Sequence, residues 1–150
     1  MARIQICAEQ VSTVNPTYSA TVTCESPRFT PIGAGDECHM SVYNVSLDAA
    51  SSPMTLSFSF NSEFEYQYLD HGVTFNDYCS VNGQSGSITL PTGLTQCCCG
   101  LTPTYVYSYS CNAAAITTTS TMVQGPVSLA FTVSNLCSTT LICINTEECP

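Results

Sequence analysis

A two-residue alternation of apolar and hydroxyl side chains constrains this sequence more than any other feature. Between residues 54 and 60, large apolar residues alternate with serine and threonine, and the same period recurs over residues 17–24, 64–68, 105–111 and 127–133. Side chains of a β-strand point alternately to its two faces, whereas a helix repeats every 3.6 residues. The sequence therefore predicts half-buried strands, and no segment has a helical period long enough for a helix.

Turn residues separate these segments at short intervals. The predicted turns lie at Pro16, residues 27–36, Ser51-Ser52-Pro53, Asp70-His71-Gly72, Asn82-Gly83, Pro91-Thr92-Gly93, residues 100–103, Gly125-Pro126 and Asn135. Short strands with frequent turns favour two packed antiparallel sheets. We therefore predict an all-β fold, an antiparallel β-sandwich of about 8–10 strands. We expect jelly-roll-like connectivity. An immunoglobulin-like arrangement is the alternative, although the chain has no tryptophan to pin the two sheets.

The length of 150 residues fits one domain with flanking segments. Residues 16–136 carry the alternating pattern and form the predicted sandwich domain. Residues 1–15 are predicted to form an N-terminal arm or connector, and residues 137–150 a cysteine-bearing C-terminal arm. Such an arm can add a strand to a neighbour's sheet.

The charge pattern excludes several classes of partner. Arg3 and Arg28 are the only lysine or arginine residues, and the net charge is −9. Nucleic acid is not expected as a partner, because counterion release needs a basic surface. No apolar run approaches the roughly 20 residues that span a bilayer, and residues 1–10 have no signal-peptide pattern, so neither a membrane span nor an export signal is expected. Serine and threonine outnumber charged residues, so the surface has few of the charges that commonly oppose self-association.

The chain contains 11 cysteines, more than a core of this size needs for stability. Disulfides persist in oxidising environments, so we predict an extracellular location, on a cell, spore or virion surface. An odd number also means that at least one cysteine has no partner within the chain.

The positions of the cysteines divide them into two sets. Candidates for disulfides between subunits lie in the flanks: Cys7, Cys137, Cys143 and Cys149. Candidates for intrachain or mixed disulfides lie between the flanks: Cys24, Cys38, Cys79, Cys97, Cys98, Cys99 and Cys111. A zinc or copper(I) site at residues 97–99 is an alternative, but the closely spaced pairs typical of structural zinc sites are absent.

No constellation of residues predicts catalysis. His39 and His71 lack a serine on a strained elbow, and Glu63 and Glu65 fit a solvated strand face better than a glycosidase pair or a calcium site. We expect no catalytic residue, no metal and no cofactor, and therefore no enzyme. An aromatic stripe of Tyr105, Tyr107 and Tyr109 is predicted to face the core or a subunit interface, with sugar stacking as the alternative.

The hydroxyl-rich β body, the Cys97-Cys98-Cys99-Gly100 cluster and the cysteines in both flanks resemble those of self-assembling, cysteine-rich proteins of bacterial spore surfaces. These include endospore appendage and exosporium subunits. The resemblance implies a jelly-roll subunit that stacks into a filament or layer through disulfides between neighbours.

The leading hypothesis is a structural subunit that binds copies of itself through strand edges and is locked by disulfides. One alternative is a monomeric secreted adhesion module with a surface or carbohydrate ligand. Another is a cysteine-rich metal-binding or redox protein.

Overall fold

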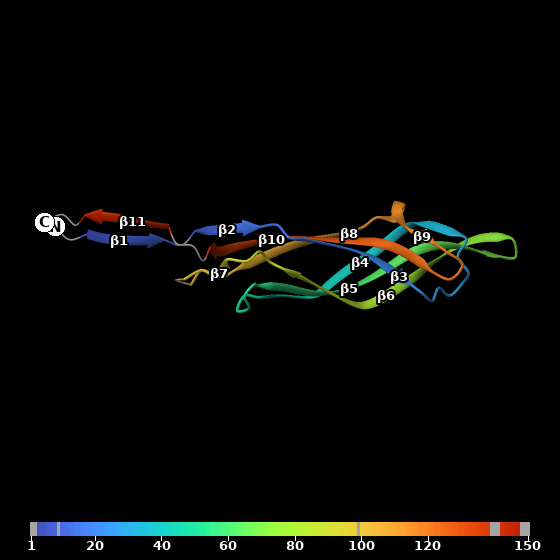
Figure 1. The fold of residues 1–150 in the computed structure, drawn as a ribbon. Helices are drawn as coiled ribbons and strands as arrows, with labels where there is room; N and C mark the ends of the chain where they lie inside the picture. Colours follow the sequence, from blue (N-terminus) through green and yellow to red (C-terminus); the bar gives the residue numbers. More distant parts are fainter. Residues whose placement is uncertain (1–2, 9, 99, 139–141, 148–150) are drawn as a thin grey trace.

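The computed structural model describes residues 3–8, 10–98, 100–138 and 142–147. Its elements in chain order are β1 (Arg3–Ala8), β2 (Val11–Val14), β3 (Thr17–Cys24), β4 (Gly33–Asp48), β5 (Thr55–Asp70), β6 (Val73–Thr89), β7 (Leu94–Gln96), β8 (Thr104–Cys111), the 3-10 helix η1 (Ala113–Ala115), β9 (Thr117–Thr118), β10 (Val123–Ser138) and β11 (Ile142–Glu147). Figure 1 shows an elongated molecule, with a β-sandwich as its body and the pair of β1 and β11 at one end. The predicted all-β sandwich is confirmed.

The first sheet consists of β4, β5 and β6, which pair in sequence order as antiparallel neighbours. In the central strand β5, every even-numbered residue from Leu56 to Tyr66 is buried, as the alternation predicts. Asp70 pairs with Val73 across the turn of His71 and Gly72, whose φ angles are 51° and 77°. Two positive φ angles in a two-residue loop match the twist of the flanking strands. The β5–β6 ladder therefore stays regular to its tip.

The second sheet is organised around β10. One edge of β10 pairs with β3 and then with β2, and the other edge pairs with β9, β8 and β7. Because β2 belongs to this sheet and β10 continues to Ser138, the sandwich includes residues 11–14 and 137–138, which we expected in the two arms. The jelly-roll connectivity remains a prediction.

The predicted turn at Asn82-Gly83 is wrong, because both residues lie inside β6. The pairing of β6 with β5 shifts register between Phe60 and Ser62, opposite this point. Gly83 has a φ of 69° and donates its N–H to Asn61 Oδ1 at 2.8 Å. The pair thus forms a β-bulge, which needs the same glycine conformation as a turn.

The predicted turns at Gly125-Pro126 and at Asn135 are also wrong, because all three residues lie inside β10. Asn135 has a φ of 62° and lies where the pairing of β10 with β2 shifts register, between Val133 and Leu136. On one edge of β10 the pairing with β9 ends at Gln124 and the pairing with β8 begins at Val127. Pro126 falls in the gap between these partners. A proline without an N–H is tolerated in a sheet where an edge lacks a partner strand.

The core lies between the inner faces of β5 and β10. Its largest fully buried side chains include Phe60, Phe64, Tyr66, Leu129, Phe131 and Val133. Tyr18 of β3 meets Phe58 edge-on, with ring centroids 4.9 Å apart. A Cβ at Gly86 would lie 2.7 Å from the Phe58 ring and 3.0 Å from Tyr18, so this aromatic pair needs a glycine on β6.

Candidate functional site

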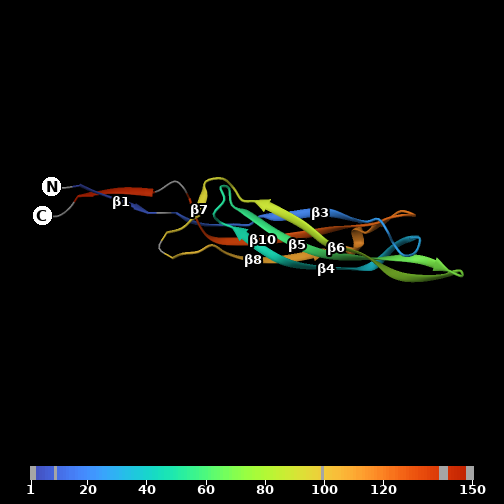
Figure 2. The same cartoon turned by 90° about the horizontal axis from the view of Figure 1, so that it is seen from below.

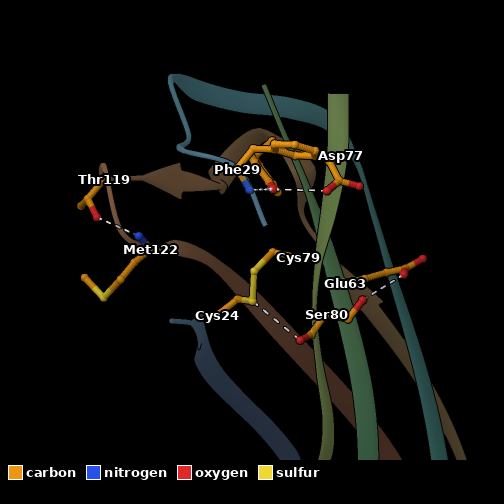
Figure 3. Close-up of a disulfide and its surroundings, with 9 residues drawn as sticks. Cys24, Phe29, Glu63, Asp77, Cys79, Ser80, Thr119 and Met122 are labelled. Atoms are coloured by element: carbon orange, nitrogen blue, oxygen red, sulfur yellow. Dashed lines mark hydrogen bonds between the residues drawn. A yellow bond between two sulfur atoms is a disulfide. The ribbon is translucent and has the colours of Figure 1, made fainter. Parts of the chain in front are cut away.

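Two disulfides close the open flanks of the sandwich, where β3 lies beside β6 and β4 beside β8. Cys24 of β3 is bonded to Cys79 of β6 (Figure 3), and Cys38 of β4 to Cys111 of β8. Their Cα atoms are 6.0 Å and 6.2 Å apart, within the normal disulfide range. The bonds span 55 and 73 residues of sequence, and each removes enough entropy from the unfolded chain to contribute about 4 kcal/mol.

Both disulfides lie in one cross-section of the body. Cys38, Phe64 and Cys79 are register partners across β4, β5 and β6. Phe64 therefore stands between the two bridged flanks, and its ring packs onto Gly125 of β10. A Cβ at Gly125 would lie only 2.2 Å from Phe64 Cε1. This layer brings together six strands of the body: β3, β4, β5, β6, β8 and β10.

A third disulfide joins Cys97 to Cys137, with Cα atoms 5.1 Å apart. We expected Cys137 to reach a neighbouring subunit, and this expectation is corrected. Cys137 lies in β10 and is completely buried, because β10 continues past the predicted boundary of the sandwich. It is therefore committed to the fold rather than to an external partner.

Besides these six cysteines, the chain has five more. Cys98 is exposed next to Cys97. Cys99 and Cys149, which we predicted as candidates for intrachain and intersubunit disulfides respectively, lie outside the described residues. Cys7 and Cys143 occupy β1 and β11 and are direct register partners.

The pair of β1 and β11, called here the terminal ribbon (residues 3–8 and 142–147), is a separate two-stranded sheet. Its register runs without a shift from Arg3 opposite Glu147 to Ala8 opposite Ile142. Among the described strands, none pairs with the outer edge of β1 or of β11. Both views show the ribbon extending from the sandwich (Figures 1 and 2). Its open edges offer main-chain hydrogen bonds to another strand.

The three predicted interface tyrosines line the flank between β8 and β4. Tyr105 is half-buried and its hydroxyl donates to the Val45 carbonyl at 2.9 Å, which links β8 to β4. Tyr107 and Tyr109 are exposed, with stacked rings 6.4 Å apart. The stripe therefore divides into one residue that closes the flank and two that remain available to a ligand or another subunit.

Sequence reasoning missed an aromatic row at the end of the body opposite the ribbon. Arg28 lies 5.1 Å from the centre of the Phe29 ring, Phe29 stacks on Tyr68 at 4.0 Å, and Tyr68 stacks on Phe75 at 5.9 Å. Tyr66 accepts a hydrogen bond from the Phe29 N–H and donates one to Asp77. The residues of this row come from three separate segments, so no local sequence pattern predicts it.

The outer face of the first sheet carries a set of carboxylates. Glu63 accepts a hydrogen bond from Ser80, and Glu65 accepts the Asp36 N–H at 2.8 Å and is almost fully buried. Tyr78 donates to Glu37, and this hydrogen bond, with burial, raises the pKa of Tyr78. Within the part of the chain that the structure describes, no three histidine, cysteine or acidic residues are grouped closely enough to hold a metal.

The three disulfides are those of a disulfide-stabilised protein of an extracellular or otherwise oxidising environment. In residues 3–8, 10–98, 100–138 and 142–147, no helix has the length and apolar character needed to cross a membrane. Comparison with protein-family models, with curated proteins and with solved structures found no match to this chain. The function must therefore be inferred from the surfaces of the molecule.

Proposed function

We propose that this protein is a structural subunit of an extracellular filament, appendage or surface layer, built from copies of this chain. Subunits associate through strand edges, and disulfides within and between subunits stabilise the assembly. A spore or virion surface is the proposed setting. The protein is not proposed to be an enzyme, and no metal or cofactor takes part.

The terminal ribbon is the observation that carries this proposal. A two-stranded sheet on its own is at best marginally stable in water, and three or more strands or a packed face are needed for independent stability. Among the described strands no third strand joins the ribbon, since β1 and β11 pair only with each other. A neighbouring subunit would supply the missing strand or cover.

The cysteines support covalent locking at the same place. With Cys137 bonded inside the body, the remaining proposed links between subunits are Cys7, Cys143 and Cys149. Cys7 and Cys143 lie in the ribbon, so a link from either residue joins subunits where the strands are incomplete.

Assembly is tested by electron microscopy and light scattering of the oxidised protein, with non-reducing gel electrophoresis to detect covalent links. We expect filaments or layers, and a ladder of multimers that reductant collapses to one band. The matched variant Cys7→Ser with Cys143→Ser should still associate but should lose much of the ladder. A monomer at all concentrations, with the same mobility with and without reductant, would refute the proposal.

A second candidate function is a monomeric secreted module that binds carbohydrate or another surface. The stacked, exposed rings of Tyr107 and Tyr109 favour it, because sugar rings pack on aromatic faces. Titration calorimetry with oligosaccharides, using Tyr107→Ala as the control variant, tests this function. Saturable heat that the variant abolishes supports it, and no heat with any glycan rules it out.

A further inference from the structure

Asn44-Val45-Ser46, in β4, is a short motif that the proposed assembly does not use. An asparagine followed two residues later by serine or threonine, with any residue but proline between them, is the acceptor motif for N-linked glycans. The sequence has this pattern at no other place. Asn15-Pro16-Thr17 has the same spacing, but proline occupies its middle position and excludes it. Because a three-residue motif also occurs by chance, its structural setting decides whether it can carry a glycan.

Asn44 lies in a β-bulge of β4. The register of β4 against β5 shifts between Tyr43 and Ser46, so that residues 44 and 45 together stand opposite Phe58. Asn44 has a φ of 52°, a conformation that asparagine adopts more readily than most other residues. A bulge interrupts the ladder and turns a side chain away from its regular direction. The asparagine of the motif therefore lies at an irregular and exposed point of the sheet.

The middle residue of the motif holds the bulge against the body. Val45 is half-buried and packs on the core, and its carbonyl accepts the hydrogen bond from the Tyr105 hydroxyl at 2.9 Å. Asn44 and Ser46, on either side of Val45, are exposed. The two groups that define an acceptor, the amide and the hydroxyl, are thus both at the surface on a backbone that is fixed between them.

An open groove next to Asn44 offers room for the first sugars of a glycan. Its volume of 420 Å³ lies within the range of roughly 300–1,000 Å³ that is usual for small-molecule sites. Two cross-strand pairs of serines from β5 and β6 line it, Ser57 with Ser87 and Ser59 with Ser85. Among the described residues that line the groove, none is charged. Serine hydroxyls both donate and accept hydrogen bonds, as the hydroxyls of a neutral sugar require.

The disulfides of the body are consistent with the route on which such glycans are attached. Disulfides form and persist in the lumen of the secretory pathway, where N-linked glycans are also added. The three bridges of the body are those of a protein from an extracellular or otherwise oxidising environment. Attachment at Asn44 therefore needs no compartment other than one in which these bridges also form.

We propose that Asn44 is the acceptor of an N-linked oligosaccharide. The donor is an oligosaccharide carried on a lipid diphosphate, and a transferase of the host catalyses the reaction. Nδ2 of Asn44 forms a bond to the anomeric carbon of the first sugar, while the bond from that carbon to the diphosphate oxygen breaks. The amide gives up one proton and the lipid diphosphate leaves, so no oxidant or reductant is needed. The inference goes beyond the proposed function and does not depend on self-assembly.

Mass spectrometry of the full chain, secreted from eukaryotic cells with an added secretion signal, tests the inference. We expect a species that is heavier than the polypeptide by one oligosaccharide. Digestion with a peptide N-glycosidase, which cleaves between the sugar and the amide, should remove the added mass and convert the amide of Asn44 to a carboxylate. Peptide mass spectrometry locates that carboxylate.

Two variants alter the motif in different ways. Asn44→Asp removes the amide nitrogen but retains a residue that tolerates a positive φ, and Ser46→Ala removes the hydroxyl but leaves Asn44 in place. Both should be secreted without the oligosaccharide, whereas Ser46→Thr keeps the hydroxyl and should carry it. The matched control is Asn15→Asp, at the exposed asparagine of the motif that proline excludes, and it should have the same added mass as the parent. Peptide maps of the three disulfides check that each variant is folded.

The inference would be overturned by a secreted, disulfide-bonded parent protein that has the mass of the polypeptide alone. It would also be overturned if the added mass persisted in Asn44→Asp and Ser46→Ala, because the glycan would then be attached elsewhere. If Asn44→Asp is not secreted, Ser46→Ala with Ser46→Thr as its control decides alone. None of these results bears on assembly, which electron microscopy and non-reducing gels measure separately.

Discussion

The sandwich body and the terminal ribbon are built from the same kind of alternating strand but differ in what completes them. In the body, β5 and β10 bury their apolar faces against each other, and disulfides bridge both flanks at the layer of Phe64. In the ribbon, β1 and β11 pair only with each other, so both outer edges of this sheet are open among the described strands. From this difference we expect that the body folds alone, whereas the proposed association would stabilise the ribbon.

The largest expected effect comes from opening one flank of the body. Replacing the Cys38–Cys111 disulfide with Cys38→Ala and Cys111→Ala removes a link spanning 73 residues and should lower the free energy of unfolding by about 4 kcal/mol. Denaturant unfolding of the diluted protein, with the parent measured at the same concentration, gives this loss. A loss below about 1 kcal/mol would mean that this bridge does not hold the flank.

The next effect concerns the layer between the disulfides. Gly125→Ala places a Cβ 2.2 Å from the Phe64 ring, and the inner face of a central strand cannot move aside. We expect a loss of about 1–3 kcal/mol in unfolding free energy, the usual cost of overpacking a core. Gly72→Ala is an unsuitable control because the φ of Gly72 is positive. Ala130→Gly alters an exposed position on β10, the strand of Gly125, and should lower the free energy of unfolding by less. Equal losses would contradict the packing described for Phe64.

A smaller effect is expected from the hydrogen bond that closes the flank between β4 and β8. Tyr105→Phe removes the hydrogen bond to the Val45 carbonyl while retaining the ring, and should cost about 1 kcal/mol. Tyr107→Phe, at an exposed ring, is the matched control and should leave unfolding unchanged. If both variants unfold like the parent, Tyr105 does not link β8 to β4 in solution.

The smallest effect should appear at high pH and only in the body, since neither β1 nor β11 contains tyrosine. The hydrogen bond to Glu37 raises the pKa of Tyr78, and burial raises the pKa of Tyr66. The folded protein then keeps protons that the unfolded chain releases. The contribution of these tyrosines to the free energy of unfolding is therefore complete below about pH 10 and is lost as the pH rises beyond it. In a titration of tyrosinate absorbance, Tyr78→Phe should remove the latest step; an unchanged curve would contradict the Glu37 contact.

The sequence predicted the fold class because alternation and burial coincide in strands such as β5. It misplaced three turns, because Gly83 and Asn135 at irregularities of the strand pairing and Gly125 at a close contact look like turn residues when no partner strand is known. Disulfide connectivity was also out of reach, since Cys38 and Cys79 meet their partners only through the register of two sheets. The aromatic row was missed for the same reason, because Phe29, Tyr68 and Phe75 come from three separate segments.

Hydrogen exchange of the backbone amides tests most directly the claim that the body is complete alone and the ribbon is completed by another copy. In the protein diluted until it is monomeric, we predict rapid exchange in β1 and β11 and slow exchange in β5 and β10. In the assembled parent protein, β1 and β11 should become protected while β5 and β10 change little. Slow exchange in β1 and β11 of the monomer, equal to that of β10, would contradict the account.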